Sequence, residues 1–131
     1  MKFVTRDIDV ALNILEILFK SGENWHGAQL AQHLQEPEMF TFKVLKQLVD
    51  TGYVISMRGT YGGYRMAPHA AGRTLLKFYN DFGHEPIVGL LTANRASGRT
   101  LAKILRLLTS LKLADVLSEE ITESPTGPEA A

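Results

Sequence analysis

Three segments in the first half of the chain have the apolar periodicity of helices. Residues 8–20 carry apolar side chains around much of the helical circumference, which is typical of a buried helix. Residues 27–35 place a narrower apolar stripe on one face, formed by Leu30, Ala31 and Leu34. A third helix is predicted over residues 37–51, because Pro37 is tolerated at a first helical position and Gly52 suits a C-cap.

The third helix is predicted to have two different faces. Its core-facing side is expected to consist of Thr41, Val44, Leu45 and Leu48. Its outward side would then present a mixture of apolar and charged residues, namely Glu38, Met39, Phe42, Lys43 and Lys46. Such a face is available for contact with another molecule.

A glycine-rich chain reversal follows this helix. Within residues 53–67, two short runs of β-favouring residues flank a tip where Gly59, Gly62 and Gly63 can adopt positive φ. Arg58 lies just before the tip. An isolated hairpin is only marginally stable, so this one must pack against another element. A helix followed by a hairpin with a basic tip is the plan of a winged helix-turn-helix, in which the helix enters the major groove of DNA and the wing contacts the backbone or the minor groove.

The second half of the chain predicts a short helix over residues 74–82 and a longer helix that Ser97 can cap. A loop at residues 83–86 and an apolar turn at residues 87–91 lie between them. The longer helix has the spacing of a packing seam. We expect it to pair with the same helix of a second chain through Leu101, Ile104, Leu105, Leu108 and Leu111.

The predicted fold class is therefore mainly α with a small β-hairpin. Residues 1–80 would form a winged helix-turn-helix domain, and residues 81–118 a sensor-like loop and the dimerisation helices. Residues 119–131 are acidic, contain proline and are almost without apolar side chains, so a disordered tail is expected there.

Two motifs resemble those of one family of winged-helix repressors, the Rrf family that includes IscR, NsrR and CymR. The first is the wing sequence Arg58-Gly59-x-x-Gly62-Gly63-Tyr64-Arg65 after Leu45-x-x-Leu48-x-x-x-Gly52-Tyr53-Val54. The second is the closing sequence Leu113-Ala114-Asp115-Val116-Leu117. The resemblance covers residues 1–118 and implies a homodimeric repressor that binds a two-fold DNA operator.

The absence of cysteine distinguishes this chain from many members of that family. Those members hold an iron–sulfur cluster with three cysteines in the loop before the dimerisation helix, whereas residues 81–96 contain none and the whole chain contains none. Cluster ligation requires thiolates at most positions. We therefore expect no cluster, no cofactor and no thiol switch. A small-molecule or protein effector would act through the loop at residues 81–96 or the dimer helix.

The candidate DNA-contacting residues come from three places. Arg58 is the strongest, because an arginine beside a glycine tip can enter a narrow minor groove. Met39 and Phe42 could contact thymine methyl groups or form an apolar patch for a protein partner. Phe40 stands where the resemblance implies a tyrosine. The other candidates are Lys2, Thr5, Arg6, Lys43, Lys46, Gly59 and Tyr61.

The charge balance supports an alternative. The formal net charge is zero, and acidic and basic residues balance through residues 1–68. The predicted DNA-binding region therefore does not form a basic patch. Glu36 and Glu38 would cap the third helix or repel phosphate. A winged-helix module that has lost sequence-specific DNA binding and contacts a protein instead is the competing hypothesis.

The remaining motifs argue against other classes. There is no recognisable nucleophile arrangement, and the glycines of the hairpin do not open a helix as a phosphate-binding loop would. Asp81, His84 and Glu85 match no metal-ligand template. We expect no enzyme activity and, without an apolar run long enough to span a membrane, a cytoplasmic protein with no membrane partner.

Overall fold

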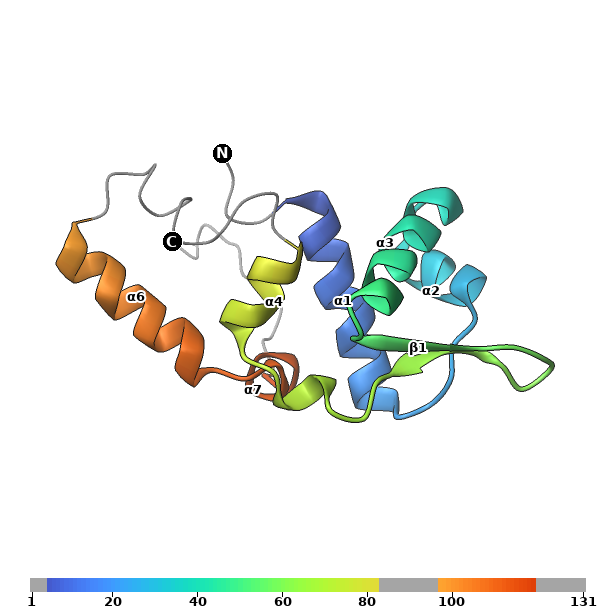
Figure 1. Ribbon diagram of the computed structural model, residues 1–131. Helices are drawn as coiled ribbons and strands as arrows, with labels where there is room; N and C mark the ends of the chain where they lie inside the picture. The colour runs from blue at the N-terminus through green and yellow to red at the C-terminus, as the bar shows by residue number, and fades with distance from the viewer. Residues whose placement is uncertain (1–4, 83–96, 120–131) are drawn as a thin grey trace.

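The computed structural model of the chain describes residues 5–82 and 97–119 (Figure 1). In chain order its elements are α1 (Arg6–Ser21), α2 (Gly27–Leu34), α3 (Glu38–Asp50), β1 (Val54–Met57), β2 (Gly63–Met66), the 3-10 turn η1 (Ala70–Gly72), α4 (Leu75–Phe82), α6 (Gly98–Ser110) and α7 (Leu113–Leu117). The predicted fold class, mainly helical with one two-stranded hairpin, is confirmed. The loop at residues 83–86, the apolar turn at residues 87–91 and the tail beyond residue 119 lie outside the described residues.

The helix ends follow the local signals with small shifts. Gly22 ends α1 with a φ of 66°, and its N–H donates to the carbonyl of Leu18 at 3.0 Å. The hydroxyl of Ser97 accepts from the N–H of Thr100 at 3.1 Å, as the predicted cap of α6. Helix α3 starts one residue later than predicted, with Pro37 as its N-cap. Its C-cap is Thr51 rather than Gly52, which follows in a left-handed conformation (φ 85°).

The core forms around α1 and the inner face of α3. The predicted inner face of α3 is confirmed, because all four of its residues are buried: Thr41, Val44, Leu45 and Leu48. The hydroxyl of Thr41 donates to the carbonyl of Pro37 at 3.0 Å, so this buried polar group is satisfied. Helix α1 contributes most of the opposing side, with Ile8, Val10, Ala11, Ile14, Leu15 and Leu18 buried.

The hairpin is antiparallel and is tied to the segment before α2. Its register pairs Val54 with Met66 and Met57 with Gly63. The backbones of Trp25 and Tyr64 exchange two hydrogen bonds of 2.9 and 2.7 Å, which supply the support that an isolated hairpin lacks.

The glycines of the hairpin serve two different purposes. Gly59 and Gly63 have the predicted positive φ, 98° and 116°. The same prediction for Gly62 is wrong, because Gly62 does not have a positive φ. A Cβ on Gly62 would lie 2.4 Å from the carbonyl oxygen of Met57, so close backbone approach is what requires glycine there.

The last helices return to the same core. Phe78 of α4 and Leu113 of α7 are fully buried, and α7 packs against α1 and η1. The N–H of Leu75 donates to the carbonyl of Leu111, and the N–H of Leu113 to that of Arg73, both at 2.8 Å. Helix α6 packs against α4, on the side away from α1 (Figure 1). No helix within residues 5–82 and 97–119 is long and apolar enough to cross a membrane.

Candidate nucleic-acid interface

The predicted outward face of α3 is exposed along its length. Its residues Glu38, Met39, Phe42, Lys43 and Lys46 are all exposed, with Met39 at 87% and Phe42 at 40%. Lys46 pairs with Asp50 at 3.3 Å, and both side chains are largely in solvent, so this ion pair is weak. Lys43 forms no ion pair with any residue that the structure describes. The face therefore offers two apolar side chains flanked by two lysines.

Phe42 is held in place by α2. The first residue of α2, Gly27, is buried, and a Cβ at that position would lie 2.3 Å from Cε1 of Phe42. The edge of the ring therefore occupies space that only glycine leaves open. Sequence reasoning used Gly27 only as a helix start. Gly27 is the first residue of α2, where no turn requires a glycine. A glycine in such a place indicates that a neighbouring side chain, here Phe42, comes close to the backbone.

Arg6 closes the other end of this surface. Its guanidinium lies 2.7 Å from the carboxylate of Glu36 and 4.5 Å above the ring centroid of Phe40. Glu36 therefore pairs with Arg6, which corrects the expectation that it serves the N-terminus of α3. Phe40 is half-buried beneath Arg6. The hydroxyl of Thr5 donates to Asp7 and does not cap α1, and Lys2 lies outside the described residues.

The tip of the hairpin projects away from the helical body (Figure 1). Arg58, Gly59 and Tyr61 are all exposed, Tyr61 to 90%. The side-chain amide of Asn24 donates to the carbonyl of Tyr61 at 3.0 Å, so the backbone of the tip is tethered while its ring is in solvent. Arg58 has no carboxylate partner in the part of the chain that the structure describes.

A polar cluster behind α3 fixes the end of that helix. The guanidinium of Arg73 donates to the carbonyls of Gly52 and Thr51 at 3.0 and 3.4 Å and lies 4.7 Å from the ring centroid of Tyr53. The hydroxyl of Tyr53 donates to Asp81 at 2.6 Å, and Asp81 also pairs with Lys77 at 3.3 Å. Burial, and then the hydrogen bond to Asp81, raises the pKa of Tyr53 well above its usual value.

The sequence does not predict this cluster. It indicates chemistry at Asp81 only through the nearby His84 and Glu85, which lie outside the described residues. The hydrogen bond joins residues 28 positions apart, so no local pattern could reveal it. Among the described residues, no group of three or more histidine, cysteine, aspartate or glutamate side chains could hold a metal ion.

The predicted dimer residues do not share one environment. Leu108 is only 7% exposed and packs into the core of its own chain, so little of its surface is open to a second chain. Leu101, Ile104 and Leu105 are partly buried, and Ile104 and Leu105 also pack against the core. The large apolar side chains that α6 and its C-cap leave exposed are Leu107 (61%), which was not predicted, and Leu111 (39%).

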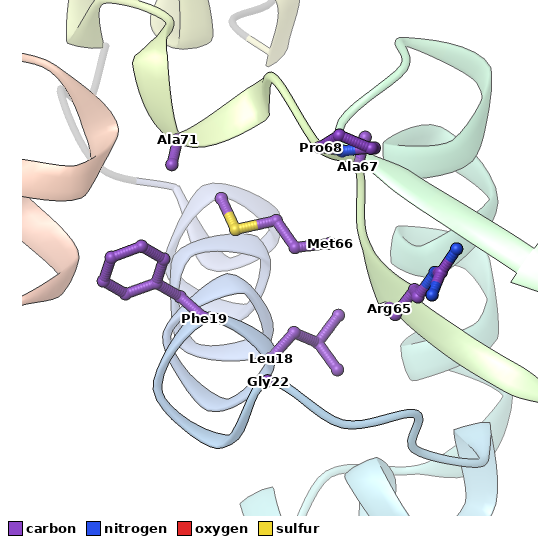
Figure 2. A pocket seen from close by; sticks show the side chains of 8 residues that line it. All are labelled: Leu18, Phe19, Gly22, Arg65, Met66, Ala67, Pro68 and Ala71. Carbon is purple, nitrogen blue, oxygen red and sulfur yellow. The ribbon is translucent and has the colours of Figure 1, made fainter.

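A cavity of about 380 Å³ lies at the base of the hairpin (Figure 2). Its lining comes from the end of α1, the end of β2 and the turn into η1: Leu18, Phe19, Gly22, Arg65, Met66, Ala67, Pro68 and Ala71. None of the predicted DNA-contacting residues lines it. The side chain of Arg65 extends away from Met66 and Phe19 in Figure 2.

The fold matches several solved structures at low sequence identity. CymR, the global cysteine regulator of B. subtilis, has a TM-score of 0.69 and 20% identity over 90% of this chain and 98% of its own. CymR of Staphylococcus aureus has a TM-score of 0.67 and 15% identity over 90% and 100%. T. potens IscR has a TM-score of 0.62 and 19% identity over 89% and 86%. These likenesses confirm the winged-helix fold.

The sequence itself matches a family. No curated protein matches the chain significantly. The family model named Rrf2, described as an iron-dependent transcriptional regulator, matches residues 4–119. The expectation that the chain is not an enzyme is thereby confirmed. The chain belongs to the Rrf2 family of transcriptional regulators.

Proposed function

We propose that the chain is a homodimeric repressor that binds a two-fold DNA operator and works without an iron–sulfur cluster. The observation that carries the proposal is the exposed outward face of α3, whose side chains are turned away from the protein's own core. In a helix-turn-helix this face lies in the major groove, and the wing reaches the backbone or the minor groove. The exposed Arg58 of the hairpin is suited to that second contact.

The local charge pattern supports DNA binding better than the net charge does. Of the two acids near the start of α3, Glu36 is compensated by Arg6 at 2.7 Å, whereas Glu38 is exposed on the outward face. Lys43 and Arg58 lack carboxylate partners among the described residues, so both charges are available to phosphates. If Lys43, Lys46 and Arg58 of both protomers contact DNA, about six phosphates are neutralised, and the logarithm of the binding constant falls with the logarithm of salt concentration with a slope of roughly −5.

A two-fold dimer would use the end of α6. Leu107 and Leu111 present apolar surface there that the described part of the chain does not cover. Pairing of this surface with the same surface of a second protomer about a two-fold axis would bury Leu107 and Leu111 of both protomers in one self-complementary contact. The two α3 helices would then meet half-sites about 34–36 Å apart, or a multiple of that distance.

An iron–sulfur cluster does not fit this chain, although the family description includes iron dependence. Cluster irons are held by cysteine thiolates at most positions, and the chain contains no cysteine. A signal would therefore reach this protein through a small-molecule or protein effector and without thiol chemistry.

A protein-interaction module is the second candidate function. It is favoured by one observation, the exposure of Met39 and Phe42 on a face whose charges sum to nearly zero. Exposed apolar side chains of this kind are also typical of a surface that binds a protein.

Binding to random duplex DNA at several salt concentrations tests the choice between the two. A DNA-binding regulator should associate with random duplexes at low salt and lose affinity steeply as salt rises. Sequencing of bound genomic fragments should then return a two-fold motif. The absence of any association at low salt would contradict the proposal and favour the protein-interaction module.

A further inference from the structure

Two apolar side chains lie next to each other on the exposed face of α3. Met39 and Phe42 are three positions apart, which makes them neighbours on the helix surface. Met39 is 87% exposed and Phe42 is 40% exposed. Most of the Met39 side chain and a substantial part of the Phe42 ring are in solvent, so the free energy of burying that exposed surface is gained only when another molecule covers it.

The ring of Phe42 is also positioned before any partner arrives. Gly27 is buried beneath it, and a methyl group there would collide with the ring at 2.3 Å. Because α2 supports one edge of the ring, the exposed part is presented in a fixed orientation. Fixing a contacting side chain in advance reduces the entropy lost on binding.

Both residues lie in the first turns of α3, which begins at Glu38. The N-terminal residues of a recognition helix are those that contact base edges. In the major groove the edges of guanine, cytosine and adenine present hydrogen-bonding groups, whereas thymine also presents the C5 methyl group. An apolar side chain in that position gains most from thymine.

We propose that Met39 and Phe42 select thymine by contact with its C5 methyl group, so that each operator half-site carries thymine at the positions these side chains face. This inference rests on the proposed function, because it requires α3 to lie in the major groove. Lys43 and Lys46 on the same face would contact phosphates and fix the register of the helix. Two apolar contacts then supply part of the specificity.

Replacement of thymine by deoxyuridine tests the assignment, because it removes only the methyl group. The operator is first obtained by selection from random duplexes, and each thymine of a half-site is then replaced in turn. At a contacted position we expect wild-type affinity to fall about fourfold, which corresponds to the burial of one methyl group. At the other positions we expect no change.

Variants assign each contact to a side chain. Met39→Ala should abolish the sensitivity to deoxyuridine at one position, and Phe42→Ala should abolish it at the other. Phe42→Ala also removes the packing of the ring on Gly27. Phe42→Leu controls for this effect, because it keeps an apolar side chain and should retain a thymine preference. Lys46→Ala is the matched control, since it should weaken binding to thymine and deoxyuridine duplexes equally.

Three outcomes would overturn the inference, and they are distinguishable. Specific binding that tolerates deoxyuridine at every position would refute thymine selection while the proposed function stands. Sensitivity to deoxyuridine that persists in both Met39→Ala and Phe42→Ala would assign the contact to other residues. The absence of binding to any duplex at low salt would refute the proposed function itself, and the inference with it.

Discussion

Tyr53→Phe tests the contact that fastens the end of α3 to α4. The substitution removes only the hydroxyl that donates to Asp81 at 2.6 Å. The ring remains, with its edge-to-face contact with Phe78 at 5.5 Å between centroids and the guanidinium of Arg73 at 4.7 Å. The change therefore isolates one hydrogen bond in an otherwise unchanged core.

The expected loss follows from the charge of the acceptor. A hydrogen bond to a charged group contributes about 1.5–3 kcal/mol to the free energy of unfolding. Asp81 is only half-buried and keeps its ion pair with Lys77 at 3.3 Å, so the lower end of that range, about 1.5 kcal/mol, applies. Lys77→Ala removes an exposed ion pair from the same carboxylate and should cost only about 0–1 kcal/mol.

Urea unfolding followed by circular dichroism measures both losses. The midpoint should fall in Tyr53→Phe without a change in the urea dependence of the free energy of unfolding. The protomer concentration must be equal in all samples, because the proposed dimerisation would stabilise the folded chain. A loss in Tyr53→Phe no larger than the loss in Lys77→Ala would show that the hydroxyl contributes nothing beyond surface electrostatics.

The same pair of proteins should respond differently to alkaline pH. Burial and the bond to Asp81 raise the pKa of Tyr53 in the folded state, whereas the unfolded value is about 10. Above pH 10 the unfolded chain releases a proton that the folded chain retains, so the free energy of unfolding of the wild type falls. Tyr53→Phe lacks this loss. The stability difference between the two should shrink between about pH 9 and pH 11, while the raised pKa of Tyr79 affects both equally. A constant difference would contradict the reasoning.

Four further substitutions test other parts of the structure. Leu107→Glu should leave the fold intact and give a monomer by sedimentation. Leu108→Glu should unfold the protomer, because it places a charge in the core. A folded Leu108→Glu protein would refute the position of α6. Gly62→Ala should destabilise the hairpin by about 1–3 kcal/mol, since the added methyl collides with the carbonyl of Met57, and urea unfolding would detect this. Arg58→Ala should weaken operator binding by about 1–3 kcal/mol, and the loss should vary with the A/T content beside the half-site; equal losses on all sequences would indicate a phosphate contact.

The elements that the sequence predicts well are those with a local physical cause. The inner face of α3 follows from helical periodicity, since Thr41, Val44, Leu45 and Leu48 recur at the spacing of one helix face, and all four are buried. The reversal of the hairpin follows from its glycines. The cap of α6 follows from one hydroxyl, Ser97.

The features that the sequence does not predict depend on contacts between distant residues. Leu108 has the spacing of a seam residue, and only the packing of α6 on α4 shows that its own chain covers it. The sequence predicts a positive φ for Gly62 and not its true constraint, because a close approach of two backbones cannot be read from local sequence. The bond from Tyr53 to Asp81 and the support of Phe42 by Gly27 join separate elements for the same reason.

Arg73 connects the candidate dimer helix to the candidate reading helix. Its carbonyl accepts from the N–H of Leu113, just after α6, and its guanidinium donates to the carbonyls of Thr51 and Gly52, just after α3. The bond from the N–H of Leu75 to the carbonyl of Leu111 holds the same junction from the other side. A rearrangement that moves the end of α6 must therefore break these two backbone hydrogen bonds or displace Arg73. Displacement of Arg73 would leave the carbonyls of Thr51 and Gly52 without their hydrogen-bond donor. In the proposed dimer, Arg73 would therefore be one link between the dimer contact and the position of α3, beside the bond from Tyr53 to Asp81 of α4, against which α6 packs.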